Sequence, residues 1–269
     1  MNTICTQYRI PLSAIVVGAG PAGLLAAAAL AKHGLRVRVL GSSDPWEPTY
    51  GLWEDELDGS FTIAEQAQVV EHRWAQTSVA TPAQPARRLN RGYVRLHTPS
   101  LHQVLRSRCD AAGVTFVEGH VAEVLPMGDR QSVADERGAH HDATIVVDAT
   151  GRGGFLSRGA GSPGGFQSAL GLCIDVDEHP WPVDCAVLMD WRAPSASTDP
   201  RTPTFLYVMP LSPTRVFVEE TSLISRDGLP FAELRMRLEE RLHGLGVHAR
   251  AVVSDEQCRF SMGGPVPDL

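Results

Sequence analysis

The sequence lacks an excess of positive charge, a cysteine pattern and a leader-like N-terminus. The formal net charge is −7, whereas nucleic-acid-binding domains usually carry a basic stripe, so we expect no nucleic-acid partner. The five cysteines show no CxxC pair and no metal-ligand spacing, which favours reduced thiols and no metal site. No basic segment precedes an apolar one at the N-terminus, so no signal peptide is expected and the predicted location is cytoplasmic.

Long uninterrupted hydrophobic runs are also lacking. The stretch from Ala14 to Ala31 carries no charge and is about long enough to cross a bilayer, but Gly18, Gly20 and Pro21 break it. A strand, a tight turn and a helix explain it better than a membrane span. Hydrophobic residues make up 43% and charged residues 20% of the 269 residues, which is typical of a globular chain with one large or two small domains.

The same stretch contains the strongest local motif, VVGAGPAG. Gly18, Gly20 and Gly23 match G-x-G-x-x-G between a strand over 14–17 and a helix over 22–33. The glycines permit a tight turn and a close approach of the backbone to a pyrophosphate, and Pro21 and Ala22 begin a helix whose N–H groups favour an anion. A second strand over 37–40 completes a βαβ unit, which predicts a site for an ADP-containing dinucleotide. A glycine turn made only for packing is the alternative.

Two neighbouring features bear on this site. The acid that usually ends the second strand and binds the ribose is replaced by Gly41, so Asp44, three residues further on, or a water molecule is the candidate substitute. The segment VVDATG ends a strand over 143–147, where a cofactor could pass close to the backbone between Asp148 and Gly151. That segment is otherwise a simple turn at the end of a strand.

The remaining chain divides by pattern. Residues 42–90 are polar and rich in proline, which predicts little regular structure beyond a short helix over 63–70. The arginines at 87, 88, 91 and 95 are interpreted as a solvated loop. Thr98 is the expected N-cap of a helix with Pro99 at its first position, and 121–125 could pair with Val133 as a hairpin.

The pattern changes after about residue 165. Short strands are predicted over 170–176, 186–189, 204–211 and 215–223, followed by a helix over 231–242. The fold class is therefore α/β: a Rossmann-like dinucleotide-binding domain over 1–165 and an antiparallel, substrate-facing sheet over 166–269.

The strand RVFVEETSL contains two adjacent acids. Because side chains alternate along a strand, Glu219 shares a face with Phe217 and Thr221, while Glu220 shares the other with Val216 and Val218. Two interpretations are open. Both acids are solvated on an edge strand, or at least one lies beside apolar surface, where burial raises its pKa and makes it a proton donor.

Several segments together resemble one family. They are, in chain order, VVGAGPAGLLAAAAL, YGLWEDEL, VVDATG, EHPWPVD, LMDWR, PTFLYVMPLSPTRVFVEETSL and MGGPVP. This set resembles lycopene cyclases of the plant and cyanobacterial type, relatives of flavin-dependent monooxygenases and reductases. Tyr93 and Arg95 match a Tyr-x-Arg segment of the family, which makes Arg95 a candidate cofactor contact, whereas His97 and Thr98 depart from it. Such proteins continue beyond MGGPVP, so the resemblance implies a C-terminally truncated chain that binds FAD weakly.

The resemblance also implies a reaction. Lycopene cyclases are isomerases that close the ends of lycopene into β-ionone rings by proton donation, with reduced FAD that is not consumed and NAD(P)H as its electron donor. Glu219 is the expected acid, with Glu220 supporting it or sharing its proton. Because lycopene dissolves in membranes, a peripheral attachment to the membrane surface is expected. The alternatives are an FAD-dependent hydroxylase or prenyl reductase of the same fold, and an inactive remnant.

Overall fold

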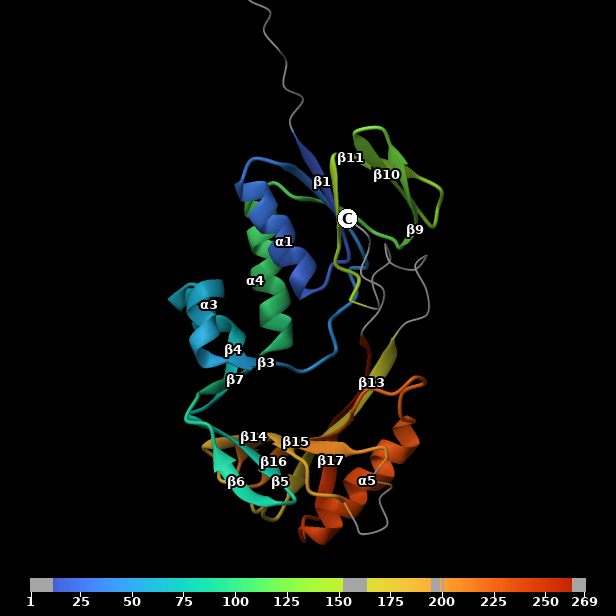
Figure 1. Ribbon diagram of the computed structural model, residues 1–269. Coiled ribbons are helices and arrows are strands. Elements are labelled where there is room, and N and C mark those ends of the chain that lie inside the picture. Colours follow the sequence, from blue (N-terminus) through green and yellow to red (C-terminus); the bar gives the residue numbers. More distant parts are fainter. Residues whose placement is uncertain (1–11, 152–163, 195–198, 200, 263–269) are drawn as a thin grey trace, which may run out of the picture. The chain divides into compact units, whose positions relative to one another are not determined.

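A computed structural model of the chain describes residues 12–151, 164–194, 199 and 201–262 (Figure 1). The chain forms two compact units, each built from two segments. The first unit is Met1–Trp46 with His102–Gly159, and the second is Glu47–Leu101 with Ala160–Leu269. The sequence analysis expected one boundary, near residue 165. In the structure, Glu47–Leu101 belongs to the second unit as well, because its strand over Gln76–Thr81 pairs with the strand over Cys185–Asp190.

The first unit is built on a parallel sheet of order β12-β1-β2-β8. Its strands are β1 (Ser13–Val17), β2 (Arg36–Leu40), β8 (Thr115–Val117) and β12 (Ile145–Asp148). Every residue of β1 is buried, as expected for the central strand of a parallel sheet with both faces covered. The predicted strand–turn–helix–strand order over residues 14–40 is confirmed.

Two helices and a small antiparallel sheet accompany this parallel sheet. The helices are α1 (Pro21–Lys32) and α4 (Thr98–Ala111), and the small sheet contains β9 (Val121–Met127), β10 (Arg130–Asp135) and β11 (His140–Ala143). The Cys109 thiol of α4 donates to the Leu24 carbonyl of α1 over 3.3 Å, so the two helices touch. The predicted hairpin around Val133 corresponds to the pairing of β9 with β10.

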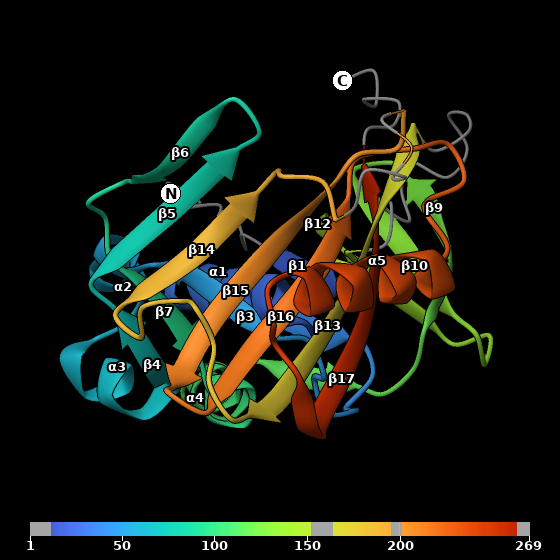
Figure 2. The same ribbon diagram turned by 90° about the horizontal axis from the view of Figure 1, so that it is seen from below.

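The second unit is built on a seven-stranded sheet of order β17-β13-β16-β15-β14-β5-β6. Its strands are β5 (Gln76–Thr81), β6 (Gln84–Arg88), β13 (Gly165–Val176), β14 (Cys185–Asp190), β15 (Thr204–Ser212), β16 (Arg215–Ser222) and β17 (Ala249–Met262). Helix α5 (Phe231–Gly244) lies over β16 and β13 (Figure 2). Leu234, Leu238 and Leu242 of this helix pack on alternate residues of the strands and form a buried hydrophobic cluster with them.

The opposite face of that sheet carries a second cluster. Trp74, Cys173, Met209 and Phe217 are buried there, and the Trp74 indole donates to the Pro210 carbonyl over 2.8 Å. Trp74 belongs to a three-stranded sheet of β3 (Tyr50–Trp53), β4 (Val70–Trp74) and β7 (Tyr93–Leu96). The one-turn η1 (Glu54–Glu56) and the short helices α2 (Leu57–Ser60) and α3 (Ile63–Val69) connect these strands. The seven-stranded sheet therefore has α5 on one face and a small sheet on the other.

The prediction of little regular structure over 42–90 is wrong, since β3, β4, β5 and β6 all lie there. Some of their partners are distant in sequence, since β5 pairs in parallel with β14. The local hydrophobic pattern cannot predict a pairing over such a distance. The short helix near residue 63 is confirmed, with a capping box between Thr62 and Glu65. The predicted cap at Thr98 is wrong. Its hydroxyl donates to the Pro48 carbonyl, and the helix begins on the His97 carbonyl.

The stretch from Ala14 to Ala31 is β1, a turn and α1. Within the described ranges, no helix combines the length and the hydropathy that crossing a bilayer requires. Of the MGGPVP motif, only Met262 lies among the described residues.

Candidate functional site

The glycine turn after β1 is dictated by close backbone contacts. Gly18 has a φ of +108°, and a Cβ atom there would lie 2.4 Å from the Ala149 oxygen. A Cβ at Gly23 would lie 2.0 Å from the Gly18 oxygen. Gly20 is different, because a Cβ there would meet no atom within 4 Å. Packing therefore explains Gly18 and Gly23, whereas the open side of Gly20 matches the predicted approach of a ligand.

The N-terminus of α1 follows this turn directly. Gly20 is its N-cap residue and has no side chain to accept from the first-turn N–H groups. Pro21 lies at the first helical position, where its missing N–H costs nothing. Ala22, with only a methyl group, is exposed. The helix therefore begins with small side chains and no side-chain cap, and the binding of a pyrophosphate at this helix start stays a prediction.

The VVDATG segment lies against the glycine turn. The Ala149 N–H donates to the Val17 carbonyl over 2.8 Å, which places the turn beside the end of β1. Asp148 accepts from the Thr150 N–H and hydroxyl, and Gly151 has a φ of +69°. The two motifs that the sequence assigned to a cofactor therefore meet at the carboxyl edge of one parallel sheet, where ligands of such folds bind.

Position 41 has a steric reason to be glycine. A Cβ atom there would lie 2.6 Å from the Ala19 nitrogen, so no acid fits on this backbone. Asp44 is exposed and accepts from the Ser42 hydroxyl over 2.5 Å. A residue that the sequence analysis missed lies nearby: Glu118, just after β8, accepts the Ser43 N–H with both oxygens at 3.0 and 3.2 Å. An acid directly after the neighbouring parallel strand is the signal that could have revealed it.

Glu219 lies in the middle of the seven-stranded sheet, on the face that carries Trp74. Its strand neighbours in register are Gly171 on β13 and Tyr207 on β15. The Thr221 hydroxyl donates to Glu219 Oε1 over 2.7 Å. Burial raises the pKa of Glu219 to about 7; the Thr221 hydrogen bond opposes this rise and the charge of Glu256 adds to it. Glu219 is therefore a carboxyl group that is about half protonated at neutral pH.

Aromatic rings surround Glu219. Tyr207 packs edge-on against Phe217, with ring centroids 6.3 Å apart, and against Tyr93 at 6.4 Å. The Tyr93 and Tyr207 hydroxyls hydrogen-bond to each other, and burial raises the pKa of both phenols. These groups stay neutral near pH 7, so the aromatic side chains beside Glu219 add no charge to its surroundings.

Glu220 has a different environment on the opposite face. It is 0% exposed, and Arg241 of α5 donates to both of its oxygens over 2.9 Å. The Thr204 hydroxyl donates to Glu220 Oε1 over 2.5 Å. The expected sharing of a proton between Glu219 and Glu220 is therefore wrong, because alternate orientation puts the two carboxyls on opposite faces and Glu220 is held as an ion pair.

The same Arg241 joins Glu220 to another motif segment. Its guanidinium also donates to the Arg192 carbonyl, and Arg192 pairs with the buried Asp190. The LMDWR and FVEET segments thus meet in one ionic network at α5, in which Asp190, Glu220 and Arg241 are buried and Arg192 reaches the surface. These contacts give Asp190, Arg192 and Glu220 a structural role, the stabilisation of the fold.

Arg95 belongs to β7 of the second unit. Its Nε lies 3.0 Å from Glu71, and its guanidinium carbon lies 5.6 Å from the centre of the Phe217 ring. The structure therefore groups Arg95 with the Glu219 face of the second unit. Its contact with a cofactor stays a prediction.

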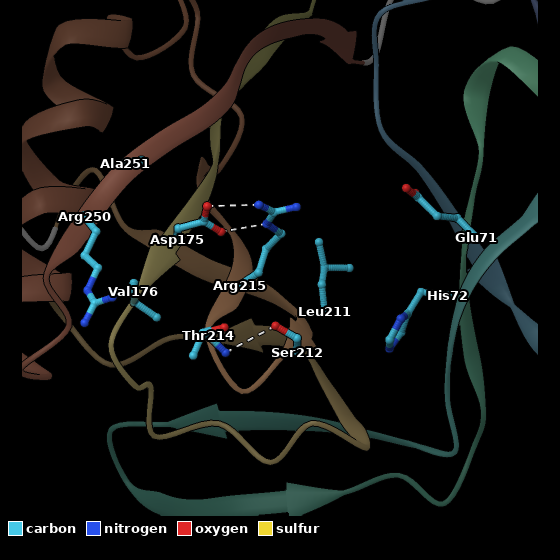
Figure 3. A pocket seen from close by; sticks show the side chains of 10 residues that line it. All are labelled: Glu71, His72, Asp175, Val176, Leu211, Ser212, Thr214, Arg215, Arg250 and Ala251. Atoms are coloured by element: carbon cyan, nitrogen blue, oxygen red, sulfur yellow. Dashed lines mark hydrogen bonds and ion pairs between the residues drawn. The ribbon is translucent and has the colours of Figure 1, made fainter.

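An open pocket of about 710 Å³ lies at the other end of β16 (Figure 3). Its charged groups are already paired: Arg215 with Asp175, Arg250 with Asp177, and Glu71 with Arg95. Burial lowers the pKa of His72, which favours its neutral form. Glu219 does not line this pocket. The pocket is therefore not the place where Glu219 would donate a proton.

Comparison with known proteins identifies the family. Residues 14–269 match the family described as "Lycopene cyclase protein". The chain belongs to this family. Relatives include a neoxanthin synthase of Solanum tuberosum, 34% identical over 97% of this chain and 54% of that protein. Lycopene beta cyclases of Solanum lycopersicum and Arabidopsis thaliana are 35% and 34% identical, each over 94% of this chain and 52% of the relative.

This member of the lycopene cyclase family spans about half the length of those curated relatives. Solved structures with the same fold include a flavin-dependent halogenase from Xanthomonas campestris, with a TM-score of 0.66 and 16% identity over 94% of this chain and 62% of that one. The peptidyl tryptophan dihydroxylase QhpG has a TM-score of 0.62 and 22% identity over 93% and 55%. The predicted flavin monooxygenase-like fold is thus confirmed.

Proposed function

We propose that the protein takes part in carotenoid biosynthesis as a lycopene cyclase, an isomerase that closes ends of lycopene into β-ionone rings. The observation that carries this proposal is Glu219, a partly buried carboxyl group with a pKa of about 7 on an aromatic face. Protonating an isolated double bond needs an acid that is neutral in apolar surroundings. Glu219 combines these properties, whereas Glu220 is held in an ion pair.

The proposed reaction begins with transfer of the Glu219 proton to the terminal double bond of the substrate. The resulting tertiary carbocation is attacked by a neighbouring double bond, which closes the ring, and loss of a proton from an adjacent carbon restores neutrality. The Tyr93, Tyr207 and Phe217 rings offer electron-rich faces that stabilise such a cation. No net oxidation occurs.

The first unit fits an FAD cofactor. Gly18, Gly20 and Gly23 with the start of α1 would hold the pyrophosphate, and the Asp148–Gly151 turn would lie along the cofactor. Glu118, beside Ser43, is the proposed acceptor for the ribose hydroxyls in place of an acid at Gly41, with Asp44 as the other candidate. When bound in its reduced form, with NAD(P)H as electron donor, the flavin would supply negative charge that favours a cationic intermediate.

The substrate sets the proposed location. Lycopene is a long hydrocarbon, so we place the protein at a membrane surface, attached peripherally from the cytoplasmic side. The partners implied are a carotenoid and the bilayer, with no nucleic acid and no metal ion. The relatives are described as chloroplastic or chromoplastic.

A second candidate is action on a different carotenoid. The neoxanthin synthase of Solanum tuberosum and the capsanthin/capsorubin synthase of Capsicum annuum are 34% and 33% identical to this chain, about as similar as the lycopene beta cyclases. A third candidate is a flavin-dependent hydroxylase or reductase, because the chain shares its fold with a peptidyl tryptophan dihydroxylase.

The test is pigment analysis in bacteria that accumulate lycopene, with and without the chain. Appearance of γ- or β-carotene supports the cyclase, and unchanged lycopene beside soluble protein contradicts it. Parallel cultures that accumulate oxygenated carotenoids test the second candidate. Purified protein with NADPH and lycopene tests the third, since a redox enzyme consumes one NADPH for each product and a cyclase does not.

The rate of ring closure should fall tenfold for each pH unit above about 7. Glu219 donates only in its neutral form, and the protonated fraction falls as the pH rises through its pKa of about 7. The measurement is the initial rate between pH 5.5 and pH 9 with lycopene in lipid vesicles. A rate that rises across this range would exclude Glu219 as the donor.

Replacement of Gly23 by Ala should weaken FAD binding roughly tenfold or more, about 1.4 kcal/mol. The added methyl group would lie 2.0 Å from the Gly18 oxygen, so the turn must open. The measurement is the quenching of flavin fluorescence during a titration with protein. Gly244→Ala is the control, because a Cβ there meets no atom within 4 Å, and equal dissociation constants for both variants would refute the assignment of this turn.

A further inference from the structure

A second carboxyl group shares the face of Glu219. On β13, Gly171 pairs with Glu219 of β16 on one side and with Glu256 of β17 on the other. Residues in register across antiparallel strands point to the same face, so the two acids flank the glycine with Cα atoms about 10 Å apart. Burial is the main cause of the raised pKa of Glu219, and the charge of Glu256 adds to it.

The Phe217 ring lies over Gly171, the residue between the two acids. A Cβ atom at Gly171 would lie 2.6 Å from Phe217 Cζ and 3.1 Å from Glu256 Cγ. The absence of a side chain at Gly171 therefore lets the Phe217 ring and the Glu256 stem lie directly over the strand. A cation held above this ring would have one acid on either side.

Glu256 accepts hydrogen bonds from Thr49. The Thr49 N–H and hydroxyl both donate to its Oε2, over 3.0 and 2.8 Å, and Arg95 adds a favourable positive charge. Hydrogen bonds from two donors favour the ionised carboxylate. Burial, the largest effect, still raises the pKa of Glu256, which makes it a stronger base than a solvated carboxylate.

Other groups on this face are poorer acceptors. Burial raises the pKa of Tyr207 well above its usual value and that of the Cys258 thiol to about 11, so both stay protonated. The carboxylates of Asp175 and Glu71 are paired with Arg215 and Arg95. Among the described residues of this face, Glu256 is thus the carboxylate placed to act with Glu219.

From this geometry we propose that Glu256 is the base of the ring closure, the group that takes the proton lost after Glu219 has donated its own. This inference rests on the proposed cyclase function. The O–H bond of Glu219 breaks as a C–H bond forms on the substrate. Ring closure then forms a C–C bond, and the adjacent C–H bond breaks to give its proton to Glu256 and its electron pair to the new double bond. The proton returns from Glu256 to Glu219 through solvent, so atoms and charges balance.

The first test compares Glu256→Gln with Asp255→Asn in lycopene-accumulating cells and in vesicle assays. Asp255 is the adjacent exposed acid of β17 and is in register with Leu172, so it points to the other face. We expect Glu256→Gln to lower kcat about 10²-fold with KM within twofold, since a positioned base contributes at least that factor. We also expect a changed ratio of ring isomers, because the cation then loses a proton elsewhere. Asp255→Asn should behave as wild type.

A loss of kcat below threefold with unchanged products would overturn the proposal. A rise in KM alone would overturn it as well, because it would assign Glu256 to substrate binding. Glu256→Asp should recover part of the rate, since it keeps the carboxylate but shortens the stem. A merely structural residue would not show this recovery.

The second test needs no turnover, so it separates failure of this inference from failure of the proposed function. Protein labelled with ¹³C at the glutamate carboxyl carbons is titrated by NMR, with Glu219→Gln and Glu256→Gln assigning the two signals. The pair should titrate as coupled groups, and Glu256→Gln should move the Glu219 midpoint down by a measurable fraction of a pH unit. An unmoved midpoint would overturn the pairing even if the wild-type chain forms rings. If the wild type forms no rings and the coupling is present, the failure belongs to the proposed reaction.

Discussion

Replacing Glu219 with Gln should reduce ring formation by about 10²- to 10⁴-fold, the range that a positioned general acid contributes. Glutamine keeps the shape of the side chain and its acceptor for the Thr221 hydroxyl, which lies 2.7 Å from Glu219 Oε1. It cannot donate a proton strong enough to generate a carbocation. The measurement is the initial rate of cyclic carotene formation by purified protein, with lycopene supplied in vesicles.

Two controls test whether the loss of activity comes from the missing proton donor rather than from lower stability or weaker FAD binding. The thermal midpoint of Glu219→Gln should stay close to that of the wild type below pH 7, because a neutral amide replaces a largely neutral acid. FAD affinity should be unchanged, because the residues proposed to hold the pyrophosphate are the glycines of the turn after β1 and the start of α1, and Glu219 is not one of them. Retention of more than a tenth of the wild-type rate would show that another group is the acid.

The different environments of the two adjacent acids show what a sequence can and cannot predict. Alternation along RVFVEETSL predicted opposite faces for Glu219 and Glu220, and the structure has them so. The sequence could not show which face was apolar and which held an arginine, because Arg241 lies 21 residues downstream on a helix whose docking depends on the whole sheet. Family resemblance selected Glu219, and the physical reason for the choice appears only with the tertiary contacts.

The same limit explains the missed strands. The pattern in β1 and α1 is local, so the βαβ unit could be predicted from a few residues. β17 has the polar run Ser254–Gln257 and is mostly exposed, so its composition gives no strand signal. β17 forms a strand because its backbone pairs along β13. Only this register shows that Glu256 lies on the same face as Glu219, which makes it a candidate base. Glu118 was missed for a similar reason, since its relation to Ser43 depends on the pairing of β2 with β8.

Removing Arg241 should destabilise the protein by about 3–5 kcal/mol, the usual cost of leaving a buried charge without its partner. Arg241→Ala leaves the carboxylate of Glu220, which is 0% exposed, with the Thr204 hydroxyl as its one donor among the described residues. The Arg192 carbonyl loses a donor as well. The measurement is the free energy of unfolding from urea denaturation at pH 7, and a loss of this size is a large part of a typical domain stability of about 5–15 kcal/mol.

A matched control lies on the same helix. Arg235 is partly exposed and its Nη1 lies 4.0 Å from Glu239, so Arg235→Ala should change the free energy of unfolding by less than about 1 kcal/mol. Adding Glu220→Met to Arg241→Met should recover stability relative to Arg241→Met alone, since no buried charge then remains. If the double variant is no more stable than the single one, the loss arises from packing of the arginine stem, and Glu220 is not the group that Arg241 serves.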